Sequence, residues 1–87
     1  METSPLPADG IRRFLELVVH GLIGEKAPCR VDHRVASGQD FFALQVPESE
    51  RALLIGHSGN TITAMRNLAA AAGALHGLRV CVDVPDE

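Results

Sequence analysis

The sequence predicts an α+β fold, in which a three-stranded sheet has three helices packed on one face. Apolar residues recur at helical spacing in three segments and alternate with polar residues in three others, and the six segments follow the order α-β-β-α-α-β. The length of 87 residues suits a single domain, because two domains would each have too little interior to bury. We expect this domain to span residues 9–85, after a flexible N-terminal tail of residues 1–8.

The first helix is expected to begin with Asp9 as its cap. Its apolar face is formed by residues at helical spacing, which are Ile11, Phe14, Leu15, Val18 and Leu22. Gly21 and Gly24 fall where this helix must stop, and Pro28 follows shortly after. Residues 21–24 have the form GxxG, but this stretch is interpreted as the end of a helix.

Two strands follow and are expected to form an antiparallel hairpin. Residues 29–36 alternate, with Val31 and Val35 on one face and charged residues on the other. Residues 41–46 alternate again. The inward residues of this second strand are Phe42, Leu44 and Val46. The Ser-Gly-Gln-Asp segment between the two strands supplies the turn.

Two helices and a last strand complete the domain. A short helix follows Pro47, with acidic residues at the positive end of the helix dipole, and it runs directly into Gly56. A longer helix starts at once, with Asn60 as its cap, and ends at Gly77. The expected apolar stripe of this helix is Ile62, Met65, Leu68, Ala69, Ala72 and Leu75. In residues 79–84, valines then alternate with other residues in a third strand.

Charge is distributed unevenly along the chain. The formal net charge is −3, yet no acidic residue occurs between Arg51 and Val82, where Arg51, Arg66 and Arg79 contribute three positive charges. A polyanion would therefore meet a locally positive surface on an acidic protein.

Several classes of protein and site are not expected. No apolar run approaches the roughly 18 residues that cross a bilayer, and the N-terminus does not resemble a signal peptide. We therefore expect a cytoplasmic protein that does not associate with a membrane. Cys29 and Cys81 form no CxxC motif and have no histidine at ligand spacing, so no metal or cofactor is expected. His33 has no evident partner and is interpreted as an ordinary strand residue. The absence of Trp and Tyr argues against the aromatic base platform of an RRM.

The second GxxG stretch, residues 56–59, joins the short helix to the long one. The first turn of a helix presents unpaired N–H groups and the positive end of its dipole, which favour an anion. Gly56 and Gly59 lack Cβ atoms, so the backbone here would approach a sugar-phosphate chain closely. Ile55 and Ile62 are expected to anchor the loop and support a neighbouring apolar groove that accepts bases.

Residues 55–62, Ile-Gly-His-Ser-Gly-Asn-Thr-Ile, fit the I-G-x-x-G-x-x-I core of a KH RNA-binding domain. The order of elements is that of the type II arrangement. From Arg51 to Val84 the chain resembles the small single-KH-domain proteins of the bacterial KhpA/YlqC group. This resemblance implies binding of single-stranded RNA with low sequence selectivity, through a loop that clamps about four nucleotides. It also implies a role as an RNA chaperone, and a partner that is a second KH-containing protein or a second copy in a dimer.

By position, the resemblance implies RNA contacts from six residues, which are Gly56, His57, Ser58, Gly59, Asn60 and Arg66. Loops of this family commonly carry Lys or Arg between the glycines, and often a basic residue after them. Here those places hold His57, Ser58 and Asn60. Because histidine is mostly neutral at pH 7, we expect weak RNA binding that tightens as the pH falls toward about 6.

Two other classes of function compete with RNA binding. A degenerate KH domain would keep the fold and serve mainly as a protein–protein module, for instance as half of a heterodimer. An enzyme is not expected, because no Lys follows Gly59 as a P-loop requires, and the spacing gives no Ser-His-Asp or Cys-His pair. A small-molecule substrate is not expected either.

Overall fold

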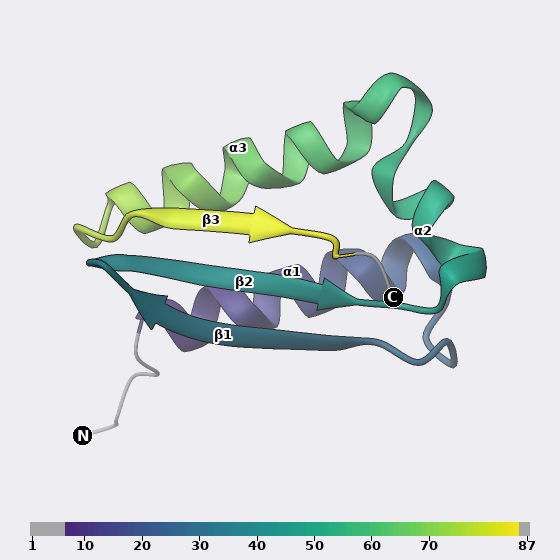
Figure 1. Cartoon of the computed structure of the whole chain (residues 1–87), viewed down its shortest axis with the longest axis horizontal. Coiled ribbons are helices and arrows are strands. Elements are labelled where there is room, and N and C mark those ends of the chain that lie inside the picture. Colours follow the sequence, from purple (N-terminus) through teal and green to yellow (C-terminus); the bar gives the residue numbers. More distant parts are fainter. Residues whose placement is uncertain (1–6, 86–87) are drawn as a thin grey trace.

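The computed structural model describes residues 7–85, which form an α+β domain (Figure 1). Its elements are α1 (Pro7–Ile23), β1 (Arg30–Ala36), β2 (Gln39–Gln45), α2 (Glu48–Ile55), the short 3-10 helix η1 (His57–Gly59), α3 (Asn60–Ala74) and β3 (Val80–Asp83). The expected order of helices and strands is therefore confirmed, and so is the three-stranded sheet. None of the helices within residues 7–85 is long and apolar enough to cross a membrane.

The sheet is mixed, with the strand order β1-β2-β3. β1 and β2 are antiparallel, as the hairpin pattern predicted, whereas β2 and β3 are parallel. The hairpin turn consists of Ser37 and Gly38 alone, with φ angles of 52° and 75°, which is a type I′ turn. The expected four-residue turn was therefore too long, because Gln39 and Asp40 already pair with β1.

α1 and α3 lie on one side of the sheet, and α2 lies at one end against both helices (Figure 1). The opposite face, which carries Phe41 and Cys81, is covered by no described element. The buried apolar residues from the helices are Ile11, Leu15, Val19, Leu54, Ile62, Met65 and Ala69. Those from the sheet and the segments that follow its strands are Val31, Phe42, Leu44, Val46, Val82 and Val84. The alternation predicted for β2 is confirmed.

The apolar face of α3 is narrower than the sequence suggested. Leu68 and Leu75 were expected on it, but they are 57% and 84% exposed. α3 instead approaches β3 with its small residues. A Cβ atom at Gly73 would lie 2.5 Å from Cγ2 of Val80, so only glycine allows this separation of helix and strand. Because the contact is so close, only the narrow row of residues that includes Ala69 and Gly73 is buried.

Two further residues that were expected to face the core are exposed, because the packing between the helices and the sheet does not extend as far as their positions. Leu22 stands in the last turn of α1 and is 42% exposed, and Val35 stands near the end of β1 and is 63% exposed. Val19, which the sequence pattern did not single out, is fully buried on α1.

The two ends of α1 are held differently. Asp9 is not the cap, because the helix already begins at Pro7; its carboxylate instead lies 3.0 Å from a guanidinium nitrogen of Arg12. At the other end, Gly24 has a φ of 102° and donates its N–H to the carbonyl of His20 at 2.9 Å. The interpretation of residues 21–24 as a helix end is confirmed, with Gly24 rather than Gly21 as the terminating residue.

His33 has partners, contrary to expectation. Its Nε2 lies 2.7 Å from Oδ1 of Asp40, and its ring stacks on Phe42 with 4.7 Å between the centroids. Both partners are on β2, and Asp40 is buried. The error arose because these contacts depend on the register of the hairpin, which places His33 opposite Phe42.

Candidate nucleic-acid interface

Gly56 ends α2 in a backbone conformation that is almost exclusive to glycine. Its φ of 83° and ψ of 174° lie in a region where a Cβ atom is strongly disfavoured. Its N–H donates to the carbonyl of Ala52 at 2.9 Å. A Cβ atom at this position would also come within 2.7 Å of the Cβ atom of Thr61, in the first turn of α3. The loop therefore crosses closely over the start of the following helix.

Two successive left-handed residues then turn the chain into α3. Ser58 has φ and ψ of 56° and 27°, and Gly59 has 74° and 13°. The N–H of Gly59 donates to the carbonyl of Gly56 at 3.2 Å, and the N–H of Asn60 donates to that of His57. Asn60 is consequently the first helical residue, with Gly59 in the cap position, so its expected capping role was wrong. Because of this compact turn, α3 begins at Asn60, one residue earlier than expected.

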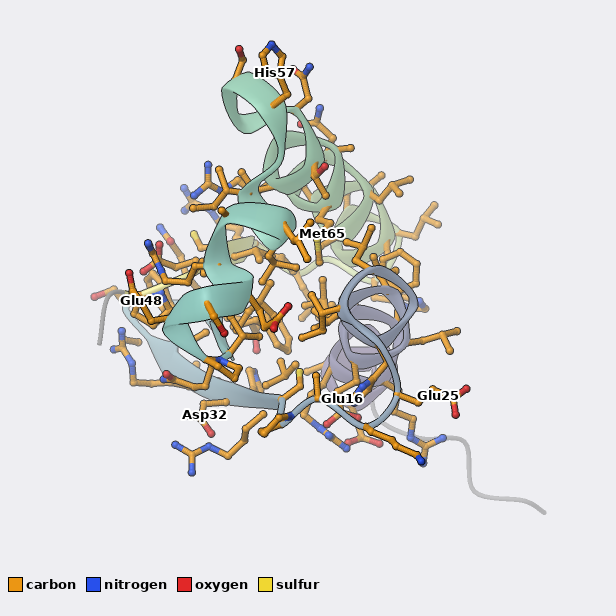
Figure 2. The ribbon with its side chains drawn as sticks, turned by 90° about the vertical axis from the view of Figure 1, so that its right-hand side faces the viewer. Glu16, Glu25, Asp32, Glu48, His57 and Met65 are labelled. Carbon is orange, nitrogen blue, oxygen red and sulfur yellow. The ribbon has the colours of Figure 1, made fainter. Side chains whose placement is uncertain are left out.

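The tip of this loop consists of His57 and Ser58, which are both exposed. The described part of the chain provides no hydrogen-bond acceptor for their backbone N–H groups. The His57 side chain projects from the end of the molecule and away from the sheet (Figure 2). Two N–H donors and two polar side chains are therefore open to a ligand here.

A groove lies further along α3, between this helix and the edge of β3 with which no described segment pairs, and no residue of the loop lines it. It has a volume of about 460 Å³ and is lined by Arg66, Asn67, Ala70, Val80, Cys81 and Val82. Arg66 donates its Nε–H to the carbonyl of Val82 at 3.0 Å, so its guanidinium is held over the strand edge. Since Arg66 is exposed, this fixed positive charge also faces solvent along the groove.

The structure brings the expected site residues together in part. Residues 56–60 form one continuous surface, and Arg66 lies on the same helix, about 9 Å further along at 1.5 Å per residue. Ile62 is buried and Ile55 is partly buried, so both support the loop from inside. Neither lines the groove.

The sequence pattern did not identify the other residues of the groove. Asn67 and Ala70 come one and four residues after Arg66, a spacing that places Ala70 on the same side of the helix as Arg66. The strand residues could not be found in this way, because their exposure depends on β3 being at the edge of the sheet.

Four acidic residues that Figure 2 labels lie away from the loop. Glu16, Glu25, Asp32 and Glu48 are all far from His57 in the molecule (Figure 2). The local positive charge expected from the sequence is thus also separated in space from these acids. One of its arginines has a structural role, because Nη2 of Arg51 donates to the carbonyl of Val84 at 2.8 Å and ties α2 to the last residues of the domain.

Comparisons with protein-family models, curated proteins and solved structures found no match.

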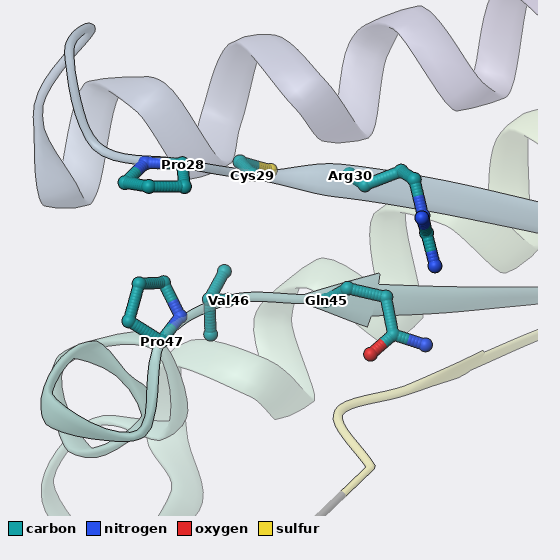
Figure 3. A pocket seen from close by; sticks show the side chains of 6 residues that line it. All are labelled: Pro28, Cys29, Arg30, Gln45, Val46 and Pro47. Carbon is teal, nitrogen blue, oxygen red and sulfur yellow. The ribbon is translucent and has the colours of Figure 1, made fainter. Parts of the chain in front are cut away.

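A second hollow lies at the open end of the β1–β2 hairpin, where β1 begins and β2 ends (Figure 3). It measures about 390 Å³ and is lined by Pro28, Cys29, Arg30, Gln45, Val46 and Pro47. Burial raises the pKa of the Cys29 thiol, and the charge of Glu16 raises it further. Both effects favour the neutral thiol, which is a poor nucleophile and metal ligand. No three His, Cys, Asp or Glu side chains among the described residues are grouped so that they could hold a metal ion.

Proposed function

We propose that this chain is a type II KH domain that binds single-stranded RNA with low sequence selectivity. The observation that carries the proposal is the loop of residues 56–59. Its left-handed and glycine-only conformations place open N–H donors at the start of a long helix, and a groove lies further along the same helix. This arrangement favours a phosphate group.

In the proposed complex, the backbone of the RNA lies against the loop and its bases enter the groove. The N–H groups of His57 and Ser58 donate to phosphate oxygens, and Arg66 supplies the fixed positive charge. The Val82 carbonyl already accepts from Arg66, so the other outward backbone groups of β3, together with Asn67, offer hydrogen bonds to base edges. Because most of these contacts are to the RNA backbone, the binding is weakly selective, as suits a protein that acts as an RNA chaperone.

The test is fluorescence anisotropy of labelled single-stranded RNA with the full chain and with His57→Asp/Ser58→Asp. Two carboxylates at the loop tip would repel phosphates, so we expect at least a tenfold loss of affinity. The matched control is Lys26→Asp, which changes the net charge equally on an exposed segment outside the loop and groove. If both variants bind RNA equally well, the loop is not the RNA site.

A second candidate function, protein association, is favoured by apolar residues on the helix surfaces. The exposed leucines of α1, α2 and α3 are Leu17, Leu22, Leu53, Leu68 and Leu75. Where exposed apolar side chains form a contiguous patch, they often mark a protein interface. The same double-aspartate variant separates the two functions, because it would retain a protein partner that binds the helices while losing RNA.

A further inference from the structure

The outer edge of β1 is free. β1 stands at one side of the sheet, and no segment within residues 7–85 pairs with its outer edge. The N–H of Asp40 donates to the carbonyl of Arg79, so Asp40 directs its groups toward β3 and not toward β1. Val35, which lies opposite Asp40, is therefore in a non-hydrogen-bonded pair. Because such pairs alternate along a ladder, Val31, His33 and Val35 direct their backbone groups outward.

The charges on this strand alternate in sign. Arg30, Asp32 and Arg34 project from the open face of the sheet, at every second position. Asp32 is partly exposed and contacts Arg30 of its own strand at 2.9 Å. Charged residues on an edge strand usually discourage pairing with another strand. Here their order makes the edge complementary to itself in one register.

We propose that β1 pairs antiparallel with β1 of a second copy, about a two-fold axis at His33, to form a continuous six-stranded sheet. In this register Asp32 lies opposite the partner's Arg34, and Arg34 lies opposite the partner's Asp32. Val31 lies opposite the partner's Val35. All three residues with outward backbone groups then form hydrogen-bonded pairs, and the apolar surface of Val35, which is 63% exposed in the single chain, is covered.

The neighbouring registers are less favourable. An axis at Asp32 would place two aspartates opposite each other and Arg30 opposite the partner's Arg34. An axis at Arg34 would place two arginines opposite each other. Each of these registers also leaves one residue with outward backbone groups unpaired. Like charges directly opposite one another destabilise a sheet, so charge selects the register at His33.

The side chains at the edge are compatible with this pairing. His33 is held toward β2 by Asp40 and Phe42, and so it does not extend across the free edge. The guanidinium of Arg34 lies 4.8 Å from the ring centroid of Phe41, a weak contact at an exposed site that it can exchange for the partner's Asp32.

Sedimentation velocity of the full chain over a range of concentrations tests the proposal. The wild-type chain should reach twice its mass of 9.3 kDa. Arg34→Asp and Asp32→Arg each place like charges across the axis twice, and each should weaken self-association by roughly tenfold or more. An equimolar mixture of the two variants should associate again, because opposite charges then face one another in the mixed pair.

The matched control is Arg30→Asp, which changes the charge as much as Arg34→Asp but faces the partner's Ala36. It should self-associate more strongly than Arg34→Asp, and circular dichroism should show that every variant is folded. A wild-type chain that remains monomeric to millimolar concentration would overturn the proposal. So would a mixture that fails to associate, or a control that dissociates as much as Arg34→Asp.

Discussion

The Cβ atom that any other residue would carry at position 56 would lie 2.7 Å from the Cβ atom of Thr61. The backbone of Gly56, at the end of α2, therefore lies close to Thr61 in the first turn of α3, and this close approach constrains the path of the loop between the two helices. The two glycines of the loop are therefore not equivalent, since a Cβ atom on Gly59 would meet nothing within 4 Å.

Gly56→Ala should destabilise the domain by about 3 kcal/mol or more, because it adds a steric conflict to a glycine-only conformation. Gly59→Ala should cost only about 1–2 kcal/mol, the usual penalty for a left-handed residue without a conflict. Urea unfolding followed by circular dichroism measures both values. Equal losses for the two variants would show that the contact with Thr61 does not constrain the loop.

His57→Lys should strengthen RNA binding, because it places a permanent charge at the exposed tip of the loop. One added phosphate contact should steepen the slope of log affinity against log salt concentration by about 0.7. Anisotropy titrations at several salt concentrations measure this slope. As a control, His76→Lys adds the same charge after the last turn of α3, outside the groove, and should leave the slope unchanged.

Arg66→Ala should weaken RNA binding and flatten the salt slope, since it removes the guanidinium beside the groove. It should also cost about 1 kcal/mol of stability through the lost hydrogen bond to Val82. Arg66→Lys keeps the charge and should retain most of the affinity. RNA binding by Arg66→Ala that equals the wild type would restrict Arg66 to its structural contact.

The Cys29 thiol should be alkylated more slowly in the folded chain than in urea at the same mildly alkaline pH. Burial, the larger cause, and the charge of Glu16 raise its pKa, so less thiolate is present in the folded state. A Cys81→Ser background isolates Cys29, and mass spectrometry follows its reaction with iodoacetamide. Equal rates in the two states would contradict the expectation.

The raised pKa of Cys29 also makes the free energy of unfolding depend on pH, because the folded and unfolded states bind the thiol proton with different affinity. Because the pKa of Cys29 is higher in the folded state, its contribution is fully present below the pKa of the unfolded thiol. That contribution is lost as the pH rises through the folded-state pKa. The free energy of unfolding of the Cys81→Ser chain should therefore fall more steeply at alkaline pH than that of a chain in which Cys29 is also serine.

Local patterns in the sequence predicted the elements and much of the core. Alternation identified the inward residues of β2, and Gly24 and Gly56 marked the ends of two helices. Patterns could not show how wide an area each helix covers. Leu68 and Leu75 fit an apolar stripe, yet they are exposed because Gly73 brings α3 onto β3 along a narrow line.

Contacts between distant segments were the other limit. The bond between His33 and Asp40 depends on the hairpin register, and the groove beside Arg66 depends on which strand ends the sheet. The glycine spacing located the loop, but it did not predict the left-handed conformation of Ser58, which precedes the entry of Asn60 into the helix. Such features arise from the assembled fold and have no signature within a few neighbouring residues.

Within residues 7–85, the strand order β1-β2-β3 leaves two edges unpaired, one beside the groove and one on the far side of the sheet. RNA and a second copy of the chain would therefore not compete for the same surface. In the proposed six-stranded sheet, the two β3 edges would stand about 24 Å apart, from five strand spacings of about 4.8 Å. A single RNA strand held in one groove would then be at high effective concentration for the other, so two weak sites could act as one stronger clamp.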